Sequence, residues 1–295
     1  MHTIRRGVAL PIAVVILLVG ATLWFVDVLA RPGSGPVSLS RHGAATAYTF
    51  VDDASGEIHV GGVREQRPRP TASTAKLITA LTVLERMPLA RGEDGPTLTM
   101  TEADADRYRS YAGRGGSAVA VGAGQELSEY ELLVGMLLPS ANNLADTLAV
   151  WAFGSLPEYR RAADEFVRSL GMTSTRVGTD ASGFSPTTTS TARDLTLLAA
   201  AAIRNPVIAE IVAREEAVLS GVGVVRNTNW LLDRPGVVGL KTGTTDEAGG
   251  VFLFAATVGV PGRLVVGAVQ GEGRSADDAI DRASRLLDEI AGAES

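Results

Sequence analysis

The stretch from Val237 to Gln270, VVGLKTGTTDEAGGVFLFAATVGVPGRLVVGAVQ, decides the fold. It contains three apolar runs, Val237–Thr242, Gly250–Val258 and Arg263–Gln270, and its last turn holds Pro261-Gly262. Strands joined by such short turns must be antiparallel. An amphipathic helix is expected directly after them, over Ala276–Ala291, because five apolar residues there fall on one helical stripe. These are Ile280, Ala283, Leu286, Leu287 and Ile290.

The region before this sheet is mainly helical. Two runs near its start, Ala47–Val51 and Glu57–Gly61, flank a polar turn and predict a hairpin. Arg64–Pro70 contains two prolines and is not expected to form regular structure. Helical spacing of apolar residues then predicts helices over Ser73–Arg86 and over 128–138, 141–152, 158–170, 191–203 and 206–213. The fold class is therefore α+β, an antiparallel sheet flanked by helices with an inserted all-helical region.

The N-terminus predicts export from the cytoplasm. Val8–Val26 is a run of 19 residues without a charge, which as a helix would span roughly 28 Å, about one bilayer core. Arg5 and Arg6 precede it, so the N-terminus should stay in the cytoplasm while the rest is translocated. Its length favours a membrane anchor, and a signal peptide cleaved after Ala30 is the alternative. Residues 31–43 form a predicted linker rich in Gly, Pro and Ser, which leaves 44–295 as the main folded domain.

Composition excludes several chemistries. The chain has no cysteine and only three histidines, so disulfides, thiolate nucleophiles, cysteine zinc sites and His-rich metal centres are not expected. A net charge of −6 argues against nucleic acid as a partner. Of the 27 basic residues only Lys76 and Lys241 are lysines. A lysine side chain can act as a base when it is desolvated, whereas arginine stays protonated.

Lys76 lies in Ser73-Thr74-Ala75-Lys76, at the start of a predicted helix. Residues three apart share a helix face, so the lysine amine can approach the serine hydroxyl. A nucleophile beside a base is the arrangement that covalent acyl transfer requires. The alternative is that Ser73 only caps the helix and Lys76 is a solvated charge.

Two further polar stretches interrupt apolar segments. Lys241-Thr242-Gly243-Thr244 ends a predicted strand, where an open edge would pair with an extended peptide and the lysine would lie beside a carboxylate. Ser140-Ala141-Asn142 follows an apolar helix. Taken singly, each has a simpler interpretation: a solvated lysine at a strand end, and Ser140 or Asn142 as N-cap of the next helix.

Together the three stretches give Ser-x-x-Lys, Ser-x-Asn and Lys-Thr-Gly in the order found in penicillin-binding proteins and class A β-lactamases. The chain resembles the serine-type D-Ala-D-Ala carboxypeptidases, the low-molecular-mass penicillin-binding proteins with a β-lactamase/transpeptidase-like fold. The resemblance covers roughly residues 45–290 and rests on TASTAKLITA, ELLVGMLLPSANNLAD, DASGFS, STARDL, NTNWLL and GLKTGTTDEAGG.

The resemblance implies a role for each motif residue. Ser73 attacks the carbonyl between the two terminal D-alanines of a peptidoglycan stem peptide, and Lys76 is its general base. Ser140 passes a proton to the leaving amine. The substrate is bound by Asn142 and by Lys241, Thr242, Gly243 and Thr244, and the backbone N–H groups of Ser73 and Thr244 form the oxyanion hole. β-Lactams should acylate Ser73, and no metal or cofactor is implied.

The family often holds the substrate carboxylate with an additional arginine, for which Arg263 and Arg274 are the candidates. A Ser-His-Asp triad is poorly supported, because His2 and His42 lie outside the predicted sheet and helices and His59 lies on a hairpin strand. Alternatives kept open are a DD-endopeptidase, a class A-like β-lactamase and a non-catalytic D-Ala-D-Ala binder. The β-lactamase is disfavoured because Glu158 and Glu165, which could activate a water, lie on a helix face expected to be solvated.

Overall fold

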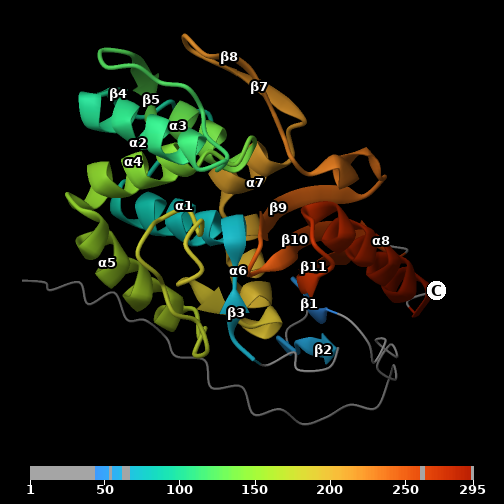
Figure 1. Ribbon diagram of the computed structural model, residues 1–295. Coiled ribbons are helices and arrows are strands. Elements are labelled where there is room, and N and C mark those ends of the chain that lie inside the picture. The colour runs from blue at the N-terminus through green and yellow to red at the C-terminus, as the bar shows by residue number, and fades with distance from the viewer. Residues whose placement is uncertain (1–43, 53–54, 62–66, 260–262, 294–295) are drawn as a thin grey trace, which may run out of the picture. The chain divides into compact units, whose positions relative to one another are not determined.

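The computed structural model of the protein describes residues 44–52, 55–61, 67–259 and 263–293. Its main sheet has five strands in the order β2-β1-β11-β10-β9, and every neighbouring pair is antiparallel (Figure 1). The strands are β1 (Ala45–Phe50), β2 (His59–Gly61), β9 (Val237–Thr245), β10 (Gly249–Val258) and β11 (Arg263–Glu272). The predicted hairpin and the three C-terminal strands are thus confirmed, and β9 is an edge strand as expected.

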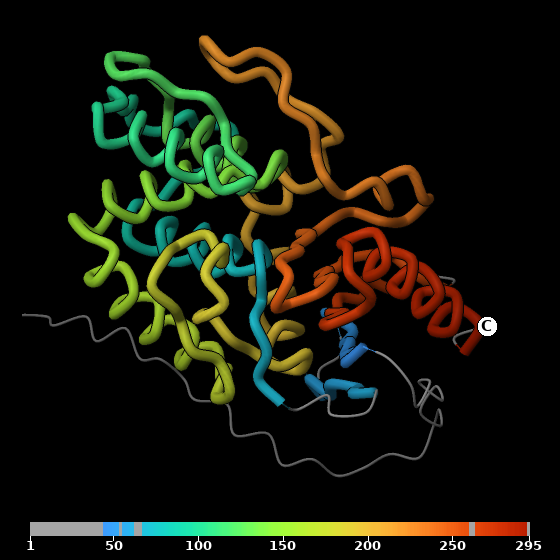
Figure 2. Tube along the Cα trace, in the orientation of Figure 1, coloured from blue at the N-terminus to red at the C-terminus, as the bar shows by residue number. Residues whose placement is uncertain are grey.

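The N-terminal hairpin and the C-terminal strands belong to one sheet because β1 pairs with β11, from Ala45 opposite Gln270 to Phe50 opposite Val265. In the tube view of Figure 2 the blue strand β1 accordingly lies beneath the orange and red part of the chain, which includes its partner β11. The chain leaves the sheet after β2 and returns to it at β9, so the helices between them form an insertion, as predicted.

Both faces of the sheet are covered, which explains why β10 is apolar along its length rather than alternating. Phe252 and Phe254 face α8 (Ala276–Ala293), whose predicted stripe is buried against them. Val251 and Leu253 face the other side, which α6 (Ala192–Arg204) covers. Fully burying one such side chain contributes about 1.5–3 kcal/mol to the free energy of folding. The sheet is therefore a rigid support for β9 at its edge.

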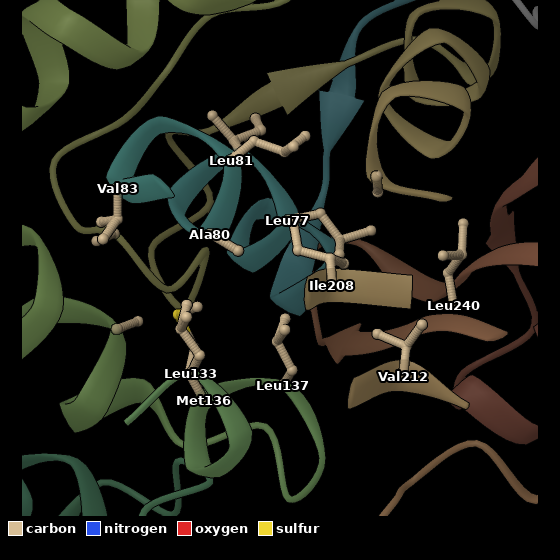
Figure 3. Close-up of a cluster of buried hydrophobic side chains, with 14 of the residues drawn as sticks. Leu77, Ala80, Leu81, Val83, Leu133, Met136, Leu137, Ile208, Val212 and Leu240 are labelled. Carbon is tan, nitrogen blue, oxygen red and sulfur yellow. The ribbon is translucent and has the colours of Figure 1, made fainter. Parts of the chain in front are cut away.

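The inserted region is built around α1, which lies in the middle of its helices. A shared apolar cluster joins Leu77 of α1 to Leu137, Ile208 and Leu240 (Figure 3). The helices are α1 (Ala75–Arg86), α2 (Glu102–Gly113), α3 (Glu129–Leu137), α4 (Asn142–Phe153), α5 (Leu156–Ser169) and α7 (Pro206–Val212). Because this cluster reaches from α1 to β9, it fixes the helix relative to the edge of the sheet.

Several elements were not predicted. Helix α2 has few buried residues and no apolar stripe, although Thr101 and Asp104 form a capping box at its start. Three short two-stranded ribbons were also missed: β4 (Thr97–Thr99) with β5 (Glu126–Ser128), β7 (Glu216–Leu219) with β8 (Gly223–Arg226), and β3 (Arg69–Pro70) with β6 (Thr189–Ser190). The expectation that Arg64–Pro70 is irregular is therefore wrong at its last two residues, which form β3. Pro70 has no N–H to donate, but so short a strand can still pair with β6.

The predicted membrane segment and linker lie outside the described residues. Among the helices that the structure describes, none has both the length and the apolar character needed to span a membrane by itself, although α6 and α7 together satisfy that test across a 98° bend.

Candidate active site

Ser73 lies in a 3-10 turn, η1 (Ala72–Thr74), that leads into α1. The prediction of a helix starting at Ser73 was two residues early, and the N-cap of α1 is Thr74, without a side-chain capping bond. Ala72 has a φ of 46°, in the left-handed region that costs a non-glycine residue energy and clusters at functional sites. Gly183 packs directly on the Ala72 carbonyl oxygen, where any side chain would clash. The turn thus leaves the Ser73 hydroxyl free of a capping role.

The Lys76 amine is fully buried and makes three hydrogen bonds. Nζ lies 2.8 Å from Oγ of Ser73, 2.7 Å from Oδ1 of Asn142 and 3.0 Å from the carbonyl oxygen of Ser182. An ammonium has three donors, so these acceptors satisfy it fully. All three partners are neutral, and a neutral amine in the same place would use its lone pair to accept the Ser73 proton. The alternative of a solvated Lys76 is therefore wrong.

Burial holds the pKa of Lys76 well below the usual value for lysine, and the positive charge of Lys241 lowers this pKa further. The carboxylates of Asp180 and Asp146 act in the opposite direction. Neither carboxylate contacts the amine. Asp180 accepts backbone N–H bonds from the turn that carries Ser182, and Asp146 accepts from Ala181 N and from the Tyr111 hydroxyl. Lys76 is thus oriented by neutral groups and surrounded by fixed charges, which suits a base.

Ser140 and Asn142 lie at the junction of α3 and α4. Ser140 has a φ of 65°, and its buried Oγ has no hydrogen-bond partner among the described residues. The N-cap of α4 is Ala141, which makes no side-chain cap, so the alternative in which Ser140 or Asn142 caps this helix is wrong. Oδ1 of Asn142 instead accepts a hydrogen bond from the Lys76 amine, so the Nδ2 group of Asn142 can donate to another partner.

Lys241 lies near the middle of β9 and is 1% exposed, so the alternative of a solvated lysine is wrong here as well. Its amine donates to the carbonyl of Thr242 at 3.2 Å, and burial lowers its pKa to about 7. The Thr242 hydroxyl pairs with that of Thr228 at 2.6 Å. A bound carboxylate would supply the opposite charge that the buried ammonium lacks and would raise its pKa again.

Gly243 brings β9 against the nucleophile. A Cβ atom built on Gly243 would lie 2.9 Å from the backbone nitrogen of Ser73 and 3.2 Å from that of Thr74. The strand therefore passes the Ser73 amide at a distance that only glycine permits, and Thr244 follows immediately. Backbone N–H groups at such a position are the donors that stabilise an oxyanion.

The structure thus brings every predicted site residue to the junction of α1, α4 and β9. Sequence reasoning missed Ser182 and Asp180, whose turn supplies the third acceptor for Lys76, and Thr228, which holds Thr242. The signal was present in DASGFS, where Asp180 is followed by residues that favour a side-chain-stabilised turn.

The two candidate arginines lie at opposite ends of β11. Arg263 begins the strand, and its guanidinium lies 3.8 Å from the centre of the Phe50 ring. Arg274 follows the other end, where Glu272 pairs with Gly250 and Gly250 pairs with Thr244 of β9. Arg274 is therefore at the Thr244 end of the sheet, whereas Arg263 is at the end where β9 begins.

The remaining candidates lie away from this junction. His59 lies in β2, at the edge of the sheet opposite β9, and stacks on Tyr48 of β1, which supports a structural role. Glu158 and Glu165 are exposed on α5, where both pair with Arg161, as expected for a solvated helix face. Within the described ranges no three His, Cys, Asp or Glu residues are grouped so that they could hold a metal ion.

A serine paired with a desolvated lysine, beside the edge strand of an antiparallel sheet, defines a serine acyl-transfer enzyme of the penicillin-recognising fold class. Comparison with known proteins agrees. The family model described as D-alanyl-D-alanine carboxypeptidase matches residues 37–269, and the chain belongs to this family of serine peptidases.

Two relatives and one solved structure carry the same description, and a further relative is described as an endopeptidase. The D-alanyl-D-alanine carboxypeptidase DacB2 of Mycobacterium tuberculosis is 33% identical over 81% of this chain and 78% of its own length. A D-alanyl-D-alanine endopeptidase of Escherichia coli is 29% identical over 76% and 74%. The chain spans about half (53%) of the Escherichia coli carboxypeptidase DacA, at 28% identity over 73% of this chain. A crystal structure of a Mycobacterium tuberculosis D-alanyl-D-alanine carboxypeptidase superposes with a TM-score of 0.73, at 29% identity, covering 88% of this chain and 94% of that one.

Proposed function

We propose that this protein is a serine DD-carboxypeptidase that removes the terminal D-alanine from peptidoglycan stem peptides. The observation that carries the proposal is the 2.8 Å contact between Nζ of Lys76 and Oγ of Ser73, made by a buried amine whose other partners are neutral. Family membership supports the choice of substrate.

The chemistry follows from the contacts. Neutral Lys76 takes the Ser73 proton while Oγ forms a bond to the carbonyl carbon between the two D-alanines. The Ser73 and Thr244 amides stabilise the resulting oxyanion, and each such donor contributes about 2.7–4 kcal/mol in acyl transfer. The C–N bond then breaks. The leaving amine takes a proton through Ser140, whose Oγ has no competing partner among the described residues. Water releases the acyl group from Ser73.

Binding of the substrate is assigned to β9 and its surroundings. Its open edge pairs with the extended peptide, Asn142 donates Nδ2 to the peptide backbone, and the Lys241 ammonium attracts the terminal carboxylate. Arg274 is assigned as the additional carboxylate ligand, because it lies at the Thr244 end of the sheet whereas Arg263 does not.

The decisive experiment is to incubate the purified protein with a D-Ala-D-Ala pentapeptide and, separately, with a cross-linked muropeptide. Release of D-alanine from the pentapeptide, abolished in Ser73→Ala, is the expected result. Cleavage of only the cross-linked compound would show a DD-endopeptidase, the second candidate, which the similarity to the Escherichia coli endopeptidase favours. Binding without cleavage of either compound would show a non-catalytic binder and would refute the proposal.

β-Lactams are expected to acylate Ser73 and to be released slowly. Glu158 and Glu165 are exposed on α5 and both pair with Arg161, so neither is placed to activate a water at an acyl-enzyme. Purified protein should therefore retain a fluorescent penicillin for minutes or longer. Rapid hydrolysis of nitrocefin, lost in Ser73→Ala, would instead identify a β-lactamase.

We further infer that the catalytic domain works outside the cytoplasmic membrane, exported by the Val8–Val26 segment. The uncharged run and the preceding arginines support this inference. N-terminal sequencing of protein from the membrane fraction separates an anchor from a signal peptide, since a mature start at Arg31 means cleavage. Recovery of the protein in the cytoplasmic fraction would refute export.

A further inference from the structure

Arg114, at the end of α2, is held over two aromatic rings. Its guanidinium carbon lies 4.8 Å from the centre of the Tyr111 ring and 5.0 Å from that of Phe184, and the two rings meet edge to face at 5.5 Å. Its Nε donates to the carbonyl of Ser110 at 3.1 Å. Cation–π contacts of this kind fix a guanidinium in place, so the terminal nitrogens of Arg114 project from a defined position.

This arginine lies one aromatic ring away from the candidate active site. A Cβ atom built on Gly116 would lie 2.8 Å from Nδ2 of Asn142 and 3.0 Å from the Phe184 ring, so Phe184 and the Asn142 amide face the same glycine. Phe184 also belongs to the turn whose Ser182 carbonyl accepts from Lys76. Arg114 therefore borders the site on the side of Asn142.

The charge of Arg114 is not neutralised by the protein. Its neighbours Arg107 and Arg109 both pair with carboxylates of their own helix, Asp104 and Asp106. No carboxylate of residues 44–52, 55–61, 67–259 or 263–293 lies within ion-pair distance of Arg114. Since Nε is used by Ser110, the two terminal nitrogens remain as a planar pair of donors, the geometry that matches a carboxylate.

We propose that Arg114 determines specificity by binding a carboxylate on the acyl-donor peptide, carried by the residue that precedes the two D-alanines. The inference rests on the proposed function, in which Asn142 bonds the donor backbone. An extended peptide advances about 3.3–3.6 Å per residue, so the side chain one residue beyond the Asn142 contact comes within reach of the Phe184 ring and the guanidinium on it. Stem peptides whose third residue is a diamino-dicarboxylic acid have such a group, and those with lysine there lack it.

Two matched substrate pairs test this. The first pair is the pentapeptides with meso-diaminopimelate or L-lysine at the third position, which differ by one carboxylate. The second pair is carbenicillin and benzylpenicillin, which differ by one carboxylate on the acylamino side chain. For the native protein we expect kcat/KM, or the acylation rate constant, to favour the extra carboxylate by about twofold to fivefold, as for one exposed ion pair.

The informative variant is Arg114→Gln, which keeps the length and polarity of the side chain but removes its charge. The ratio within each pair should fall to about 1 through a change in KM, and Arg114→Lys should retain part of the preference. Arg109→Gln is the matched control on the same helix and should leave both ratios unchanged.

If Arg114 only supports local structure, Arg114→Gln should lower the rate constants for both compounds of a pair by the same factor. The ratio between the two compounds would then stay unchanged, and this result would overturn the proposal. A ratio near 1 within both pairs for the native protein would also overturn the proposal. If neither peptide is cleaved while penicillin still labels Ser73, the carboxypeptidase assignment fails, and the penicillin pair still decides the role of Arg114.

Discussion

Gly243→Ala should test how much acylation depends on the position of β9, because it displaces this strand without altering any catalytic side chain. The added methyl group would lie 2.9 Å from the Ser73 nitrogen, 3.1 Å from Cβ of Ala72 and 3.2 Å from the Thr74 nitrogen. Two of these atoms are backbone, which cannot rotate away. Relief to an ordinary contact requires β9 to move off η1 by roughly half an ångström. Because the two oxyanion donors lie on η1 and β9, that displacement separates them.

The expected loss in the acylation rate is about 10- to 100-fold, since a 1 Å misplacement in an active site can cost about 100-fold and loss of one oxyanion donor about 100- to 1,000-fold. The assay is stopped-flow or gel-based acylation by a fluorescent penicillin, with the melting temperature recorded in parallel. Gly122→Ala is the control, because a Cβ there meets nothing within 4 Å. Acylation of Gly243→Ala at the native rate, with an unchanged melting temperature, would refute the reasoning.

Four further results are expected. Lys76→Arg keeps the charge but cannot accept a proton, so acylation should fall by at least about 100-fold, and a native rate would show that Lys76 is not the base. In the native protein the lowered pKa of Lys76 means that acylation rises with pH and levels off well below the ordinary lysine pKa, and a rise centred near 10.5 would contradict this. Arg274→Ala should raise KM for the pentapeptide while Arg263→Ala should not, and equal effects would contradict the placement of the two residues. Phe254→Ala, at a fully buried position, should lower the free energy of unfolding by about 3–5 kcal/mol in denaturant titration, and a loss under about 1 kcal/mol would show that this core collapses around the cavity.

The sheet was predictable because its strands carry strong local signals. The run from Gly250 to Val258 is apolar on both faces, and tight turns leave antiparallel pairing as the only arrangement. Helix α2 was not predictable from periodicity, since EADADRYRSYAG has few apolar residues and depends on its capping box. The ribbon of β7 and β8 was missed because Val218 and Val224 are exposed, so no burial pattern marks their strands.

The site was predictable in its residues but not in its support. Ser73, Lys76 and Lys241 were singled out because a rare residue type occurred at motif positions. The carbonyl of Ser182, by contrast, belongs to the backbone, and every residue has one, so no residue type could have marked it. Its selection depends on the turn around Asp180, which only the folded chain places beside α1.

The open edge of β9 also has a consequence for self-association. An unpaired strand is a template for any other strand, including the same one in a second molecule. The apolar first half of β9 is shielded by α7, where Val212 lies beside Leu240 (Figure 3). Its second half, from Lys241 to Thr245, has no large apolar residue, which makes it a poor seed for strand stacking. The residues that line this edge for a peptide therefore also disfavour strand pairing between two copies of the protein, and an aliphatic residue placed at Thr245 should increase that pairing.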